Sequence, residues 1–116
     1  WLLPRLVGTA RARGLALLAE PLSAETAQEW GLIWKAVDDD RLIAEAEAMC
    51  LQFAKGPTIG LGLIKRALDA AEQNGLDRQL DLERDLQREA GFTSDYTEGV
   101  RAFMEKRAPS FSGRGG

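Results

Sequence analysis

Leucine and alanine dominate this chain, and β-branched residues are scarce. There are 17 Leu and 17 Ala, but Ile and Val together supply only 7 residues. Alanine and leucine favour helices, whereas strands prefer Val, Ile and aromatic residues. We therefore predict a mainly α-helical chain. Its 116 residues suit one domain, and a hydrophobic content of 45% is enough to bury a core.

Proline, glycine and capping residues divide the chain into segments. Ser23 is a good N-cap for a short helix, and Pro57 can start a helix at its first position. The expected helices cover residues 4–20, 23–30, 38–55, 57–74, 76–90 and 94–107, the last of them capped by Ser94 or Asp95. Three of these carry apolar stripes at helical spacing: Leu42, Ala46, Met49 and Phe53; Leu61, Ile64, Leu68 and Ala71; Tyr96, Val100 and Phe103.

Residues 32–37, Leu-Ile-Trp-Lys-Ala-Val, form the one plausible strand. A single strand leaves its backbone donors and acceptors without partners, because a strand is satisfied only by a neighbouring strand. No other segment looks like that neighbour. Either the strand prediction is wrong, or the partner lies in another chain or in a segment outside this sequence.

The charge balance and residue inventory exclude several functions. The net charge of −3 argues against nucleic acid or an anionic membrane as the main partner. The chain has no histidine, which excludes Ser-His-Asp triads, Cys-His pairs and histidine metal sites. The single cysteine, Cys50, excludes an intramolecular disulfide and is compatible with a reducing, cytoplasmic setting. No secretion signal or bilayer-spanning segment is visible.

The remaining candidates favour structural roles over chemistry. Gly60-Leu-Gly62 lacks the third glycine and the preceding strand of a dinucleotide loop. Asp38–Asp40 could hold a cation, but they suit the start of a helix better. Cys50 lies on an apolar side and is expected to be buried. The tryptophans are expected to be core or interface anchors, and the carboxylates of residues 76–90 alternate with arginines as on a solvated or subunit-facing surface.

Two stretches carry a resemblance that goes beyond composition. Residues 4–37 contain Pro-Arg-Leu-Val-Gly-Thr-Ala-Arg-Ala and Leu-Ser-Ala-Glu-Thr-Ala-Gln-Glu-Trp-Gly-Leu-Ile-Trp-Lys-Ala-Val. Residues 95–111 read Asp-Tyr-Thr-Glu-Gly-Val-Arg-Ala-Phe-Met-Glu-Lys-Arg-Ala-Pro-Ser-Phe. In order and spacing, both resemble the C-terminal part of the enoyl-CoA hydratase/isomerase (crotonase) family. Residues 60–67 and 76–90 resemble a subgroup of isomerases that act on an epoxidised phenylacetyl-CoA thioester in phenylacetate degradation.

This resemblance implies a helical C-terminal region of a crotonase-like α/β fold, whose β-spiral core half is absent from this chain. Residues 1–37 would be the end of that core, and residues 38–116 a helical oligomerisation region that forms trimers or hexamers. The family's oxyanion hole and its acidic proton-transfer residue would lie before Trp1. We therefore expect no catalytic residue and no metal ligand in this chain. Because residue 1 is Trp and not Met, we expect a fragment or a processed chain.

Two family positions carry over to this sequence. Phe103 and Lys106 match the Phe and Lys of the final-helix motif, which in the family help hold coenzyme A near its adenine and phosphates. Residues at i and i+3 share a helix face, an aromatic ring can pack on adenine, and an ammonium can meet a phosphate. Two alternatives stay open, because Phe103 continues the stripe of Tyr96 and Val100 as a core residue would, and Lys106 could be a solvated lysine.

The resemblance implies an acyl-CoA thioester as substrate and no prosthetic group, with coenzyme A present only as part of that thioester. It implies no nucleic-acid and no membrane partner. Two other readings stay open. One is a helical assembly module without a role for coenzyme A, which the charged helix at residues 76–90 also suits. The other is a hydratase or a double-bond isomerase of the same family.

Overall fold

The computed structural model describes residues 1–114, and helices are the only regular elements in that range. The prediction of a mainly α chain is therefore confirmed. The chain separates into two compact units, residues 1–43 and residues 44 onward. The boundary expected after residue 37, between the end of a core and a helical oligomerisation region, stays a prediction.

The first unit holds α1 (Leu3–Val7), α2 (Thr9–Leu18), α3 (Ala24–Glu29) and the 3₁₀ turn η1 (Asp39–Arg41). The single helix expected over residues 4–20 is wrong, because Gly8 interrupts it with φ +81° and ψ 160°. Essentially only glycine adopts this conformation. The helix expected from Ser23 is confirmed, since the Ser23 side chain accepts a hydrogen bond from the Thr26 N–H at 3.1 Å.

The predicted strand at residues 32–37 is wrong. Gly31 ends the turn after α3 with φ +75°, and the Leu32 N–H donates back to the Ala27 carbonyl at 2.9 Å. The Ala36 N–H donates to the Gln28 side chain at 2.6 Å. Backbone groups of this segment thus bond to α3 and its side chains, and no pairing strand exists within residues 1–114.

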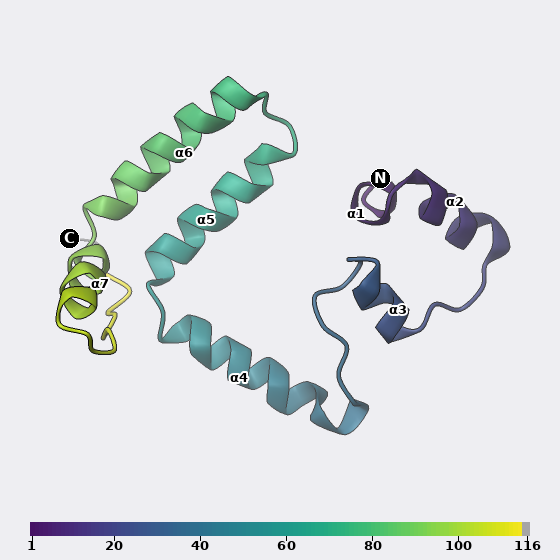
Figure 1. The fold of residues 1–116 in the computed structure, drawn as a ribbon, viewed down its shortest axis with the longest axis horizontal. Helices are drawn as coiled ribbons and strands as arrows, with labels where there is room; N and C mark the ends of the chain where they lie inside the picture. The colour runs from purple at the N-terminus through teal and green to yellow at the C-terminus, as the bar shows by residue number, and fades with distance from the viewer. Residues whose placement is uncertain (115–116) are drawn as a thin grey trace. The chain divides into compact units, whose positions relative to one another are not determined.

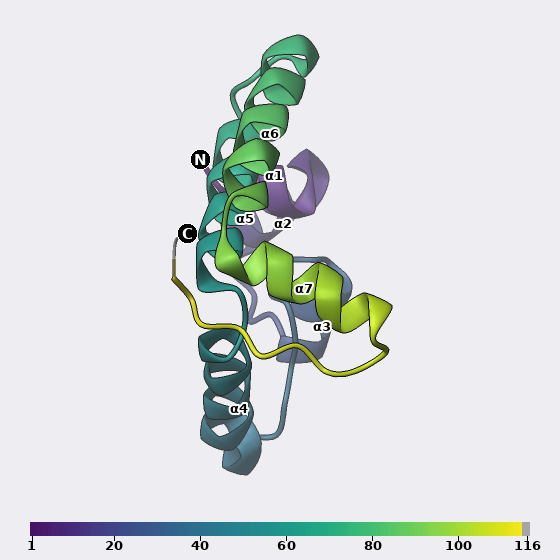
Figure 2. The ribbon, with the colours of Figure 1, turned by 90° about the vertical axis from the view of Figure 1, so that its left-hand side faces the viewer.

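The second unit contains α5 (Thr58–Ala71), α6 (Leu76–Gly91) and α7 (Ser94–Met104), together with all but the first two residues of α4 (Leu42–Ala54). Helices α5 and α6 lie side by side as an antiparallel hairpin, and α7 packs on α6 (Figure 1). Figure 2 shows α7 running across the direction of α6, with the chain after it turning back along α7. The buried apolar residues here are Leu63, Leu86 and Ala102.

Two details of the second unit differ from the prediction. The cap of α7 is Thr93, not Ser94 or Asp95, because the Thr93 hydroxyl accepts from the Tyr96 N–H at 3.1 Å. The helix also ends at Met104, whereas Arg107 was expected. Cys50, expected to be buried, is exposed, because α4 buries none of its residues within the described chain.

Many large apolar side chains are open to solvent. Helix α5 has two apolar faces: Leu63 is buried toward α6, whereas Ile64 and Leu68 are exposed. The tryptophans Trp1 and Trp34 are also exposed, so they are not core residues of this chain. Such open apolar surface is typical of a region that packs against further protein.

Candidate functional site

The row of apolar residues along α7 is open. Tyr96, Val100 and Phe103 follow the i, i+4, i+7 spacing of one helix face, and their exposed fractions are 48%, 48% and 82%. The buried positions of this helix are Asp95 and Ala102 instead. Phe103 is therefore not a core residue of this chain, and its ring is free to contact another molecule.

An open groove of about 410 Å³ runs beside this row. Tyr96, Val100 and Phe103 line it from α7, and Phe111 lines it from the segment that follows the helix. Pro57, just before α5, lines it from the other side. The lining is almost wholly apolar, which suits a flat ring or an apolar side chain better than an ion.

Lys106 lies beyond the end of α7, so the shared helix face expected for Phe103 and Lys106 is not what brings them together. Instead, Lys106 adopts a left-handed conformation with φ +53°, and its N–H donates to the Phe103 carbonyl at 3.2 Å. Its side chain is exposed, and no ion pair to it occurs within residues 1–114. The turn thus leaves an ammonium in solvent two residues after the helix.

Glu98 fixes the chain after this turn. Its carboxylate accepts from the Arg107 guanidinium at 2.6 and 3.0 Å, from Arg101 at 2.7 Å and from the Ser110 N–H at 2.9 Å. The Arg107 hydrogen bonds, followed by those from Ser110 and Arg101, hold the pKa of Glu98 well below its ordinary value. Hydrogen bonds to Glu98 and Glu105 likewise raise the pKa of Arg107.

Asp95 holds the end of the same segment. It is 4% exposed, and its carboxylate accepts from the Ser112 N–H at 2.7 Å and the Gly113 N–H at 2.9 Å. Gly113 has φ +68°, and a Cβ there would lie 2.6 Å from the Thr58 Oγ1. The segment from Glu105 to Arg114 is therefore tied to α7 at both Glu98 and Asp95. Sequence patterns alone predict neither tie.

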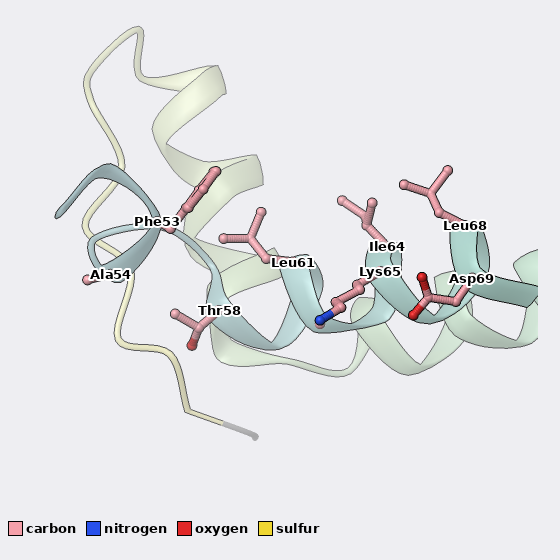
Figure 3. A pocket seen from close by; sticks show the side chains of 9 residues that line it. Phe53, Ala54, Thr58, Leu61, Ile64, Lys65, Leu68 and Asp69 are labelled. Atoms are coloured by element: carbon pink, nitrogen blue, oxygen red, sulfur yellow. The ribbon is translucent and has the colours of Figure 1, made fainter. Parts of the chain in front are cut away.

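A second open groove, of about 710 Å³, lies along α4 and α5. Figure 3 shows Phe53, Leu61, Ile64 and Leu68 projecting toward the same side of the helices. Lys65 and Asp69 lie at its edge. These apolar residues belong to the stripes that the sequence predicted for residues 42–53 and 61–71, but they face outward and not into the core of this chain.

The other candidates do not form sites. Gly60 and Gly62 lie inside α5, so they do not form a phosphate loop. Asp39 and Asp40 begin η1, and no cluster of metal-ligating side chains is found among the described residues. The alternating carboxylates and arginines of α6 form ion pairs, with Arg84 to Asp81 at 2.8 Å and Arg88 to Asp85 at 2.9 Å. No helix within residues 1–114 is long and apolar enough to cross a bilayer.

Comparison with known proteins identifies the class. The enoyl-CoA hydratase/isomerase family profile matches residues 1–114. The chain belongs to this family, and its helices correspond to the family's helical C-terminal region.

Among individual relatives, the 1,2-epoxyphenylacetyl-CoA isomerase of Escherichia coli K12 is 59% identical over 98% of this chain. The trans-2-decenoyl-[acyl-carrier-protein] isomerase of Streptococcus mutans is 35% identical over 98% of the chain. The crystal structure of an enoyl-CoA hydratase from Polaromonas sp. JS666 superposes with a TM-score of 0.90 at 31% identity, covering 97% of this chain. The chain spans only 44%, 43% and 44% of these proteins.

Proposed function

We propose that this chain is the C-terminal part of a CoA-thioester isomerase that acts on ring-1,2-epoxyphenylacetyl-CoA and forms the oxepin thioester. The identity of 59% to an isomerase of that name supports this substrate over those of other family members. Among the relatives compared above, the isomerase of Streptococcus mutans is named for an acyl-carrier-protein substrate and is only 35% identical.

The chemistry of such an isomerase is carried outside this chain. The family resemblance implies an enolate-like intermediate stabilised by two backbone N–H groups, an electrostatic effect that dominates reactions of this kind. It also implies an acidic residue for proton transfer, in a turn that would precede Trp1. No carboxylate of this chain matches that position, so we expect residues 1–116 alone to be inactive.

The role proposed for this chain is to hold coenzyme A and to assemble subunits. The observation that carries the first part is the open ring of Phe103, which is 82% exposed beside an apolar groove. Close to it in the chain is Lys106, whose ammonium makes no ion pair within residues 1–114. An exposed aromatic ring can stack on adenine, and an ammonium can neutralise a phosphate. We propose these two residues as coenzyme A contacts, either in the same subunit or in a neighbouring one.

The observation that supports assembly is the open apolar groove of Phe53, Leu61, Ile64 and Leu68. A monomer gains nothing from exposing such a groove, whereas burying it stabilises an interface by roughly 25 cal/mol for each Å² removed from water. We propose a trimer, or a pair of trimers, for the intact protein. A helical assembly module without coenzyme A is the rival function, and the charged outer face of α6 suits it as well.

The test compares substrates and variants in the protein that carries this chain. Product analysis with ring-1,2-epoxyphenylacetyl-CoA should give the oxepin thioester, and crotonyl-CoA should be hydrated far more slowly. Phe103→Ala and Lys106→Met should raise KM for the CoA thioester with little change in kcat. Lys55→Met is the matched control, because Lys55 is another exposed lysine, directly after the end of α4.

Two results would contradict the proposal. Faster hydration of crotonyl-CoA would make the protein a hydratase of the same family. Unchanged KM values in both variants would leave the assembly role and remove the coenzyme A contact.

A further inference from the structure

The turn that carries Lys106 has a conformation that glycine normally occupies. The Arg107 N–H donates to the Ala102 carbonyl at 3.0 Å, and the Lys106 N–H donates to the Phe103 carbonyl at 3.2 Å. This pair of bonds defines a Schellman motif, in which the left-handed residue is usually glycine. Lys106 holds that position with φ +53°. A left-handed conformation strains any residue that has a Cβ.

The same chain contains the unstrained version of this motif. At the end of α3, the Leu32 N–H donates to the Ala27 carbonyl and the Gly31 N–H to the Gln28 carbonyl. There the left-handed residue is Gly31, with φ +75°. Two helices thus end in the same turn, one with the favoured glycine and one with a lysine. The strain at Lys106 persists only because surrounding contacts hold the turn.

Those contacts come mainly from Glu98. The Arg107 guanidinium binds both carboxylate oxygens of Glu98, at 2.6 and 3.0 Å, and also binds Glu105 at 2.6 Å. Such a two-point ion pair fixes direction as well as distance. The residue directly after Lys106 is therefore anchored to α7 at Glu98, less than two turns before the helix ends at Met104. The Ser110 N–H adds a fourth bond from the returning chain, at 2.9 Å to Glu98.

We propose that Glu98 is a positioning residue for coenzyme A: by holding Arg107, it fixes the strained turn from which the Lys106 side chain extends, three residues after Phe103. This inference rests on the proposed contact of Phe103 and Lys106 with coenzyme A. In this proposal Glu98 acts through Arg107 and does not touch coenzyme A. Its carboxylate is occupied by Arg107, Arg101 and Ser110, which leaves it no role in binding a phosphate.

The test measures binding of CoA and of pantetheine, which lacks the adenine and its phosphates, to the protein that carries this chain. Lys106→Met should raise Kd for CoA about fivefold, the value of a surface ion pair, and leave pantetheine unchanged. Glu98→Gln should also weaken the binding of CoA and leave the binding of pantetheine unchanged. The double variant should bind no more weakly than Lys106→Met alone, because Glu98 acts through Lys106. Glu89→Gln, whose ion pair to Arg66 is long at 3.5 Å, is the control.

A second measurement separates positioning from general damage. Lys106→Gly should weaken the binding of CoA as Lys106→Met does. It should also raise the Tm of the protein by about 2–4 °C, because the strain of the left-handed conformation is relieved. Ala19→Gly is its control, since Ala19 also has a left-handed φ of +54° after a helix. Ala19→Gly should raise the Tm without affecting the binding of CoA. If Glu98→Gln unfolds the turn, Arg107→Lys is the variant to use instead. It keeps the positive charge but removes the two-point ion pair, and it should still weaken the binding of CoA but not that of pantetheine.

The outcomes separate the two proposals. The positioning role is wrong if Lys106→Met weakens the binding of CoA but Glu98→Gln does not. It is also wrong if the two effects on CoA binding add in the double variant. In both cases the coenzyme A contact stands. If Glu98→Gln weakens CoA and pantetheine equally, its effect is structural and the positioning role is again wrong. If Lys106→Met leaves CoA binding unchanged, the proposed contact fails, and the positioning role fails with it.

Discussion

Two leucines on α5 should differ sharply in their contribution to stability. Leu63 is 6% exposed and packs toward α6, whereas Leu68 is 65% exposed in the open groove. Truncating a buried leucine removes its favourable transfer free energy and leaves a cavity. Leu63→Ala should therefore lower the free energy of unfolding by about 2–5 kcal/mol. Leu68 has about a third of its surface buried, and full burial of a leucine is worth about 1.5–3 kcal/mol. Leu68→Ala should therefore cost about 0.5–1 kcal/mol.

The assay is urea denaturation of residues 1–116 at low protein concentration, followed by helical circular dichroism. Equal costs for the two variants would refute the assignment of two different faces to α5. The same pair also reports assembly. If other protein covers the groove at high concentration, or in the protein that carries this chain, Leu68 becomes buried there. Leu68→Ala should then lower the free energy of unfolding nearly as much as Leu63→Ala does. A constant small cost under all conditions would mean that the groove stays open.

Three further predictions concern α7 and the segment that follows it. Thr93→Ala should lower the free energy of unfolding by about 1 kcal/mol because the cap of α7 is lost, whereas Thr93→Ser should cost little; equal stability of all three proteins would contradict this. The pKa of Glu98 is lower in the folded chain than its ordinary value of 4.5, so its stabilisation is present above that pH and is lost as the pH falls below it. Denaturation at a series of pH values should show this acid loss, and Glu98→Gln should reduce it; an unchanged pH profile in the variant would contradict the assignment. Gly113→Ala should release the end of the chain, because the new Cβ would lie 2.6 Å from the Thr58 Oγ1, and tryptic cleavage there should accelerate. Gly62→Ala, which meets nothing within 4 Å, is the control and should leave cleavage unchanged.

The helices were predictable because their signals are local. The cap at Ser23 and the glycine or proline breaks before α5 and α6 need only a few neighbouring residues. The failures have non-local causes. Residues 32–37 have strand-forming side chains, yet strand formation depends on a partner strand, and residues 1–114 supply none. A lone glycine within a helical pattern is often tolerated, so the break at Gly8 follows from its actual φ, which the pattern does not reveal.

The candidate site was predictable in part. Phe103 and Lys106 came from the resemblance, and periodicity alone favoured a core position for Phe103 as much as a binding role. Its exposure depends on which face of α7 meets α6, and the buried Ala102 occupies that face. The Glu98–Arg107 pair was missed because nine sequence positions separate the partners and the chain reverses between them. The left-handed turn at Lys106 was missed because lysine rarely adopts it.

A crystal structure of the protein that carries this chain, with coenzyme A bound, would show directly whether Phe103 and Lys106 contact the ligand. We expect the adenine ring against Phe103, in the same or a neighbouring subunit, with the Lys106 ammonium within ion-pair distance of a phosphate and Glu98 still bound to Arg107. Coenzyme A bound elsewhere, with Phe103 and Lys106 in solvent or buried against protein, would contradict it.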